Sequence, residues 1–213
     1  MIRVHGVPLS PFVRKVLLTL DLKGVPYEID PVFPGAGDAD FLKISPLGKI
    51  PVLEHDGFTV ADTSVICRYL DRVFPEPSIY PDTPADEARA CWLEELGDSR
   101  LIEACAPIFI QRMLNPKMMG RPCDEAIVQD AIEEKLPPLL TYLESVTPEA
   151  GPLVGEHITI ADIGVVTCFI QAAYGDYQVD GARYPKLRAW IDRMLAEDVV
   201  AARLASERAM LPG

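Results

Sequence analysis

The sequence predicts an α/β unit at the amino-terminal end of the chain, followed by an all-helical unit. Over the first part of the chain, apolar residues alternate with polar ones or recur at helical spacing, in the order β-α-β and then β-β-α. The proline-punctuated stretch SIYPDTPAD at 78–86 follows, and beyond it the apolar pattern has helical spacing only. We therefore predict domains at 1–77 and 87–213, joined by a linker at 78–86.

A strand, a helix and a second strand are predicted first. Residues 2–5 alternate apolar and polar side chains, as a short strand does. Apolar residues at 13, 16, 17 and 20 lie on one face of a helix, which Gly24 and Pro26 end. An alternating strand begins at Tyr27. Elements in this order form a right-handed βαβ unit with parallel strands.

A hairpin and a helix complete the first unit. Asp56-Gly57 separates two strand-like runs, 51–55 and 58–60, and this dipeptide supplies the positive φ angles of a two-residue turn. Apolar residues at 65, 66, 69, 70 and 73 then form the face of a helix that closes at Phe74-Pro75.

The second unit contains predicted helices at 86–115, 123–146, 159–174, 185–196 and 198–209. Pro107 lies inside the first of them and is expected to kink it or divide it in two.

Composition excludes several classes of partner. The chain has 32 acidic and 20 basic residues, and its net charge of −12 repels nucleic acid and anionic lipid surfaces. No apolar run approaches the roughly 18 residues of a membrane span, and the first residues lack the apolar core of a secretory signal. We therefore expect a soluble, cytoplasmic protein. Its 5 cysteines form no CxxC pair and are expected to be free thiols.

Ser10 stands between the first strand and the first helix and is followed at once by Pro11. One interpretation is structural, because serine is a favoured N-cap and proline is tolerated at the first helical position. The other is functional, because a hydroxyl at a helix amino terminus can donate a hydrogen bond to a thiolate held near the positive end of the helix dipole.

Two further stretches could hold a peptide-like ligand. A cis bond between Ile50 and Pro51 would turn the Ile50 main chain outward to pair with such a ligand, whereas a trans proline would mark an ordinary edge strand. Asp62 and Thr63 could be a plain helix cap, or could receive the ammonium and carboxylate of an amino-acid head together with the first helix amides.

On these motifs the chain resembles the cytosolic glutathione transferase superfamily over essentially its whole length. The matching stretches are VPLSPFVRKVLLTLDLKGVPYE, SPLGKIPVLEHDG, VADTSVICRYLDRVFP, ITIADIGVVTCF and YPKLRAWIDRM. The motifs are most similar to serine-type classes of the phi and tau kind. The resemblance implies a thioredoxin-like amino-terminal domain packed on an all-helical domain, glutathione as co-substrate, and no metal.

The resemblance also implies roles for individual residues. Ser10 matches the serine that stabilises the glutathione thiolate, Ile50 and cis Pro51 match the pair that binds the cysteinyl main chain, and Asp62-Thr63 matches a Glu-Ser pair that binds the γ-glutamyl group. Asp62 is one methylene shorter than that glutamate. Lys49 could neutralise the glycyl carboxylate or be an ordinary surface lysine. The stretch Thr159-Ile160-Ala161-Asp162 resembles a buried capping box whose role is folding.

A hydrophobic electrophile is the second substrate that the resemblance implies. Its pocket is expected between the domains, and the candidate residues are Leu9, Phe12, Ile108, Arg112, Met113 and Tyr174. A homodimer is implied as well, through the helix around Val65 to Leu70 and the one that follows Asp86.

Other functions remain compatible with the same residues. Peroxide reduction, isomerisation and dehalogenation could all start from an activated glutathione thiolate. A non-catalytic binding or scaffold protein is the alternative from another class, although a scaffold has no need to keep Ser10, Pro51 and an acid-hydroxyl pair. The resemblance disfavours chemistry through an enzyme cysteine, because thiol-reducing relatives place a cysteine where Ser10 stands and no cysteine precedes Cys67 in this chain.

Overall fold

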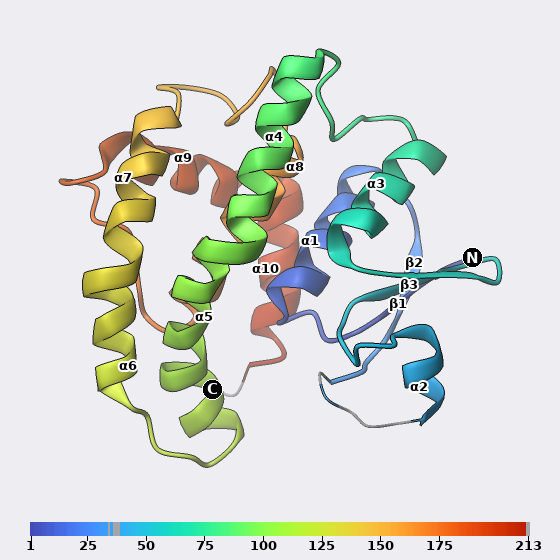
Figure 1. Ribbon diagram of the computed structural model, residues 1–213, viewed down its shortest axis with the longest axis horizontal. Coiled ribbons are helices and arrows are strands. Elements are labelled where there is room, and N and C mark those ends of the chain that lie inside the picture. The colour runs from blue at the N-terminus through green and yellow to red at the C-terminus, as the bar shows by residue number, and fades with distance from the viewer. Residues whose placement is uncertain (34, 36–38, 212–213) are drawn as a thin grey trace. The chain divides into compact units, whose positions relative to one another are not determined.

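The computed structural model describes residues 1–33, 35 and 39–211, and the chain divides into two compact units, Met1–Ile79 and Tyr80–Gly213 (Figure 1). The boundary falls between Ile79 and Tyr80. Each unit is described by itself.

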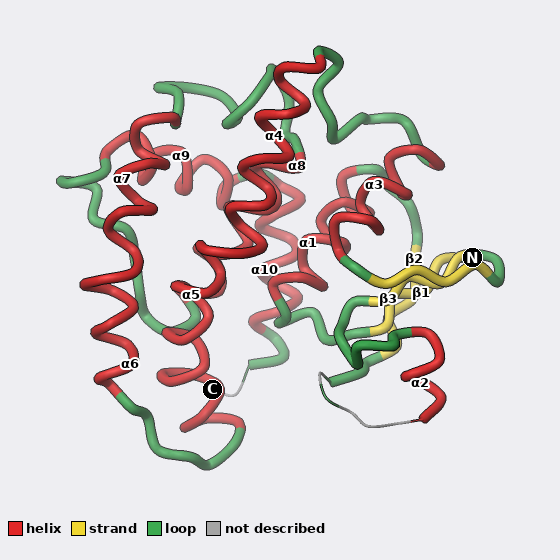
Figure 2. The backbone as a smooth tube through the Cα atoms, viewed as in Figure 1, coloured by secondary structure: helices red, strands yellow, loops and turns green. Residues whose placement is uncertain are grey.

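A four-stranded sheet organises the first unit (Figure 2). Its strands lie in the order β2-β1-β3-β4, with bounds β1 Ile2–His5, β2 Tyr27–Asp30, β3 Val52–His55 and β4 Phe58–Ala61. Strand β1 is parallel to β2 and antiparallel to β3, and β3 pairs antiparallel with β4. This confirms the predicted βαβ unit followed by a hairpin. The hairpin turn has positive φ at Asp56 (49°) and Gly57 (86°), as the Asp-Gly dipeptide predicted.

Three helices belong to this unit: α1 (Pro11–Leu22), α2 (Ala39–Ile44) and α3 (Thr63–Val73). The predicted apolar face of α1 is its core face, since Val13, Val16, Leu17 and Leu20 are all fully buried. Burying such a face against a sheet is what stabilises a helix this short.

The regular secondary structure of the second unit is all helical over its described residues. A continuous helical run consists of α4 (Pro84–Leu96), the π-helical segment η1 (Gly97–Leu101), α5 (Ile102–Phe109) and the π-helical segment η2 (Ile110–Met118). The remaining elements are α6 (Glu125–Asp130), π-helical η3 (Ala131–Lys135), α7 (Leu136–Val146), α8 (Ile160–Ala173), α9 (Pro185–Ala196) and α10 (Asp198–Arg208). The α/β unit followed by an all-helical unit is therefore confirmed.

The structure differs from the predicted bounds of the first helix, and it excludes one of the two outcomes predicted for Pro107. Helix α4 begins at Pro84, inside the stretch predicted as linker, because Thr83 accepts a hydrogen bond from the Asp86 amide and proline suits the first turn. Pro107 does not divide the first helix, which remains helical from 84 to 118. π-Helical segments lie on both sides of α5, and such segments shift the hydrogen-bond pairing that a proline interrupts.

Helix α8 is the centre of the second unit. Residues 160–172 are all buried, and the helix packs against α4 and α5. The approach to η1, directly after α4, is close, because a Cβ atom placed on Gly97 would lie 2.9 Å from the Gly164 carbonyl oxygen. The predicted capping box at its start is confirmed, with Thr159 and Asp162 bonded to each other's backbone amides.

Candidate functional site

The segments that contain the predicted site residues of the first unit lie at one end of the sheet's strands. In the strand register, His5 at the end of β1 lies opposite Val52 at the start of β3, and Val52 lies opposite Ala61 at the end of β4. The segments that contain Ser10, Ile50-Pro51 and Asp62-Thr63 leave the sheet just beyond these three positions. The antiparallel pairing therefore brings together residues that are more than 50 positions apart in the sequence.

Ser10 is the N-cap of α1, with extended backbone angles (φ −71°, ψ 129°). Its carbonyl oxygen accepts the first helical hydrogen bond from the Arg14 amide at 2.8 Å. Among the described residues, however, the Ser10 side chain has no capping hydrogen bond to the amides of its own first turn. The backbone therefore follows the structural interpretation, whereas the hydroxyl and the first-turn amides stay available for another partner.

Close packing fixes the segment that leads to Ser10. A Cβ atom on Gly6 would lie 2.6 Å from the Val13 side chain, so only glycine fits where β1 turns toward α1. Arg14 is fully buried, and its guanidinium donates to the Leu9 carbonyl at 3.5 Å. Leu9 and Phe12, on either side of Ser10-Pro11, are half-buried.

The Ile50–Pro51 bond is cis, as one of the two interpretations of the sequence required. Ile50 is 8 % exposed, yet neither its N–H nor its C=O has a hydrogen-bond partner among the described residues. A main-chain donor and acceptor left over at the start of a strand suit the main chain of a bound peptide. The preceding residue, Lys49, has an exposed side chain, and its carbonyl accepts from the Ser45 hydroxyl at 2.7 Å.

Asp62 and Thr63 begin helix α3. Asp62 is the N-cap in an unusual conformation (φ 80°), and its Oδ1 atom accepts from the Val65 amide at 3.2 Å. Positive φ is uncommon for any residue except glycine, so the surrounding structure must impose it here. Thr63 is 6 % exposed and occupies the first turn. The plain-cap interpretation is thus correct for one Asp62 oxygen.

The candidate residues of the second unit are already engaged in packing or bonding. Ile108 is fully buried, and its carbonyl oxygen lies where a Cβ on Gly175 would be only 2.6 Å away. Met113 is 7 % exposed. The Tyr174 hydroxyl donates to Glu207 at 2.9 Å. Ile108 and Met113 are therefore buried in their unit, whereas Tyr174 is half-buried.

Arg112 forms a bidentate ion pair with Glu125, at 3.1 and 3.0 Å, and also donates to the Gly175 carbonyl at 3.3 Å. The hydrogen bond from Arg112 lowers the pKa of Glu125, and the thiol of Cys123 contributes a second bond to the same carboxylate. Burial raises the pKa of Cys123 above the ordinary thiol value. The guanidinium therefore connects η2 with α6 and with the end of α8.

One residue near the site was missed by the sequence reasoning. Lys15, on α1, is fully buried, and its Nζ atom donates to the Ser64 hydroxyl at 3.2 Å. Ser64 directly follows the Asp62-Thr63 pair. The available signal was polar residues at 15, 19 and 23, a helical spacing that places them on one face of α1 and its C-cap.

Neither a membrane-spanning helix nor a metal centre is found in the part of the chain that the structure describes. No helix there is long and apolar enough to cross a bilayer. No group of three His, Cys, Asp or Glu side chains in that part is arranged to hold a metal ion.

Comparison with known proteins agrees with this architecture. Models of the glutathione S-transferase N-terminal domain and C-terminal domain match residues 4–78 and 121–207. Glutathione transferase GST 23 of Zea mays is 30 % identical over 213 residues, covering 99 % of this chain and 92 % of the relative.

Two solved structures are similar as well. A glutathione S-transferase from Rhodospirillum rubrum has a TM-score of 0.84 and 26 % identity, covering 96 % of this chain and 92 % of its own. A glutathione S-transferase from Methylobacterium radiotolerans, in complex with glutathione sulfonate, has a TM-score of 0.76 and 26 % identity, covering 95 % and 93 % of the two chains.

The fold and the site at the end of the sheet define a two-domain protein with a thioredoxin-like domain followed by a helical one. The family models and the full-length relative specify it further. The chain belongs to the glutathione S-transferase family.

Proposed function

We propose that this protein is a serine-type glutathione transferase, in which the Ser10 hydroxyl stabilises the thiolate of glutathione for attack on a hydrophobic electrophile. The proposal depends on the position of the Ser10 hydroxyl and on its lack of a capping hydrogen bond. Its hydroxyl stands at the amino terminus of α1 without capping that helix, at the end of the sheet that also presents cis Pro51 and the start of α3.

The chemistry requires the ionised form of the thiol, because a neutral thiol is a poor nucleophile at pH 7. The thiol proton passes to water, and the hydrogen bond from Ser10 and the first-turn amides of α1 stabilise the resulting anion. Sulfur then forms a bond to an electrophilic carbon, and with an aryl halide the halide ion leaves. One charge-assisted hydrogen bond contributes about 1.5–3 kcal/mol, or about one to two units of thiol pKa.

The rest of the tripeptide is assigned by its chemistry. The Ile50 N–H and C=O would pair with the cysteinyl main chain, and Asp62 with Thr63 would bind the ammonium and carboxylate of the γ-glutamyl group. Lys49, whose side chain is exposed, is assigned to the glycyl carboxylate. The bound glutathione sulfonate of the Methylobacterium radiotolerans relative supports a ligand of this kind.

The decisive experiment is the substitution Ser10→Ala. We expect kcat for conjugation of a model aryl halide to fall by about one to two orders of magnitude, because the hydrogen bond to sulfur is lost. Glutathione affinity, measured by calorimetry, should stay within about threefold, because most of the tripeptide contacts remain. Difference spectra of the bound thiolate against pH should show its pKa rising in the variant.

The Ser10→Ala experiment and two measurements on the unsubstituted protein test different parts of the proposal. An unchanged kcat in the Ser10→Ala protein would remove Ser10 from the mechanism. Failure of the unsubstituted protein to bind glutathione resin would instead favour a scaffold. Binding without conjugation, but with turnover of hydroperoxides or enones, would keep the activated thiolate and change the reaction class.

Leu9 and Phe12 are the residues that we assign to the electrophile. They flank Ser10-Pro11 and are half-buried, so each retains apolar surface beside the proposed thiolate. For Ile108, Met113 and Tyr174, the contacts described above support a packing role within the helical unit, and Arg112 is paired with Glu125.

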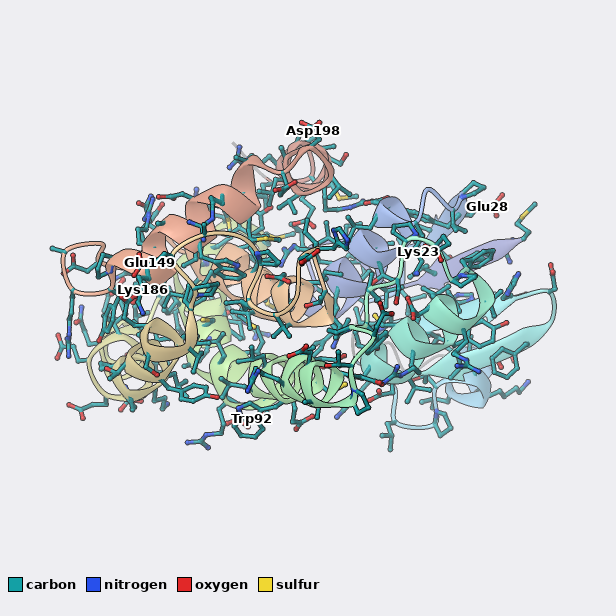
Figure 3. The ribbon with its side chains drawn as sticks, turned by 90° about the horizontal axis from the view of Figure 1, so that it is seen from above. Lys23, Glu28, Trp92, Glu149, Lys186 and Asp198 are labelled. Atoms are coloured by element: carbon teal, nitrogen blue, oxygen red, sulfur yellow. The ribbon has the colours of Figure 1, made fainter. Side chains whose placement is uncertain are left out.

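We further propose a homodimer in a reducing compartment, the cytoplasm. Helix α3 exposes Val65 (51 %) and Val73 (40 %). On α4, Trp92 is 52 % exposed (Figure 3). Large apolar side chains of this kind are enriched at protein interfaces. All five cysteines are free, which suits a reducing environment. Sedimentation at micromolar concentration tests the dimer, and a monomer there would refute it.

A further inference from the structure

Ser45 lies in the loop between α2 and β3 and is buried, with 1 % of its surface exposed (Figure 1). Its three polar groups are all bonded locally. The Ser45 N–H donates to the Phe41 carbonyl at 2.8 Å, and the Ser45 carbonyl accepts from the Gly48 amide at 2.8 Å. The Ser45 hydroxyl donates to the Lys49 carbonyl at 2.7 Å. One small side chain thus joins the end of α2 to the segment that leads into β3.

The two backbone bonds have a plain structural explanation. The Ser45 N–H continues the hydrogen bonding of α2 by one residue. Residues 45–48 then form a β-turn, for which serine at the first position, Pro46 at the second and Gly48 at the last are favoured residues. Gly48 has φ 62°, which favours glycine. The hydroxyl bond to Lys49 lies outside this turn and therefore needs a separate explanation.

The hydroxyl bond fixes the orientation of a peptide group. The Lys49 carbonyl and the Ile50 N–H belong to the same peptide, and this peptide is trans, since the cis bonds among the described residues are those before Pro51 and Pro77. In a planar trans peptide, the C=O and the N–H point in opposite directions. The Ser45 hydroxyl therefore also sets the direction of the Ile50 N–H, which points away from Ser45.

The Ile50 N–H is the donor that the site still has to offer. It has no hydrogen-bond partner among the described residues, although Ile50 is only 8 % exposed. A donor needs an acceptor, so the group of the cysteinyl main chain that it can bind is the carbonyl oxygen. Without the Ser45 hydroxyl, the peptide group between Lys49 and Ile50 is free to turn about the single bonds on either side of it, and this donor then loses its fixed direction.

We propose that Ser45 is a positioning residue for glutathione, an inference that rests on the proposed function. Its hydroxyl holds the peptide between Lys49 and Ile50 so that the Ile50 N–H is aimed at the cysteinyl carbonyl of the tripeptide. Ser45 itself does not touch the substrate. It acts on affinity for the cysteinyl main chain, whereas Ser10 acts on the ionisation of the sulfur.

The test compares two ligands on three variants. The ligands are glutathione and an analogue in which an (E)-alkene replaces the amide between cysteine and glycine, so that the cysteinyl carbonyl is absent. Ser45→Ala removes the hydroxyl, and Ser45→Thr restores one. Thr147→Val is the matched control, because the Thr147 hydroxyl is also buried and also donates at 2.7 Å to a carbonyl four residues away, that of Leu143 in the helical unit. Calorimetry gives dissociation constants, aryl halide conjugation gives kcat and KM, and circular dichroism gives melting temperatures.

We expect Ser45→Ala to weaken glutathione about fivefold and the analogue less than about twofold. KM for glutathione should rise, while kcat at saturation and the pKa of the bound thiolate should change little, because Ser10 and the first turn of α1 are untouched. Ser45→Thr should recover most of the affinity. Thr147→Val should lower the melting temperature and leave the preference for glutathione over the analogue intact.

Three results would overturn the inference: equal weakening of both ligands by Ser45→Ala, an unchanged preference in that variant, or the same loss of preference in Thr147→Val. If Ser45→Ala does not fold, Ser45→Cys keeps the size of the side chain with a weaker donor. We expect it to weaken glutathione about threefold and to spare the analogue, and unchanged binding of both ligands would exclude positioning by the hydroxyl. Failure of the unsubstituted protein to bind glutathione would refute the proposed function itself, whereas binding with a preference that the Ser45 variants leave unchanged would refute this inference alone.

Discussion

Replacing Asp162 by alanine should destabilise the helical unit without touching the proposed chemistry. Asp162 is fully buried at the start of α8, and both of its oxygens are bonded. Oδ1 accepts from the Leu153 amide at 2.7 Å and from Trp190 Nε1 at 3.1 Å. Oδ2 accepts from the Thr159 amide at 2.9 Å and its hydroxyl at 3.0 Å. One carboxylate thus joins the start of α8 to the preceding loop and to α9.

The expected loss in the free energy of unfolding follows from the hydrogen-bond donors that lose Asp162 as their acceptor. Asp162→Ala strands two backbone amides and one indole N–H in the interior, at about 1–3 kcal/mol each, whereas the Thr159 hydroxyl can rotate to another acceptor. An opposing effect reduces this sum. Burial raises the pKa of Asp162, which shows that the carboxylate carries a desolvation cost that alanine does not. We therefore expect a loss of about 3–5 kcal/mol in the free energy of unfolding.

Urea unfolding followed by tryptophan fluorescence measures this loss. The chain has two tryptophans, and a Trp92→Phe background leaves Trp190 as the only indole, inside the region that Asp162 joins. A double-mutant cycle with Trp190→Phe isolates the indole bond, which should contribute about 1–2 kcal/mol of coupling. A total loss below about 1 kcal/mol, or a folded variant with altered glutathione affinity, would refute the reasoning.

Two further predictions concern the helical unit. Gly97→Ala should lower the free energy of unfolding by about 1–3 kcal/mol, because its Cβ would be 2.9 Å from the backbone carbonyl of Gly164; an unchanged urea midpoint would contradict the close packing. Glu125→Gln should lower the melting temperature at pH 7, and the difference from the unsubstituted protein should shrink as the pH falls below the unfolded pKa of about 4.3. The hydrogen bond from Arg112 depresses the folded pKa of Glu125, so the stabilisation is present above its unfolded pKa and is lost as the pH falls through the folded value; a difference between the two proteins that is as large at pH 3 as at pH 7 would exclude this ion pair as its cause.

The elements of the fold were predictable because their signals are local. The Asp56-Gly57 turn, the apolar face of α1 and the capping box before α8 each depend on residues within a few positions of one another. The structure confirms all three. Pro107 shows the limit of such rules, because a local rule for proline does not include the π-helical pairing on either side of α5.

The sequence predicted which residues form the candidate site, but not the peptide-bond isomer at Pro51 or the hydrogen bonding of the Ser10 side chain. The sequence placed Ser10, Pro51 and Thr63 at the ends of elements, and each had both a structural and a functional interpretation. The structure chose a cis bond at Pro51, and among the described residues it gave the Ser10 hydroxyl no capping role. Both outcomes depend on the turn geometry at this end of the sheet, which antiparallel pairing between distant segments creates.

By itself, the sequence determined the order of strands and helices, the division into an α/β part and a helical part, and the residue types offered at that end of the sheet. Periodicity, turn residues and caps act over one or two turns of chain, so one-dimensional reasoning reaches them. Only the tertiary structure decided that Lys15 meets Ser64, that Arg112 is held by Glu125, and that Asp162 bonds to Trp190. A buried polar group bonds to whichever partner the packing of helices and strands brings within about 3 Å. That partner can be any number of residues away in the sequence, so no local pattern identifies it.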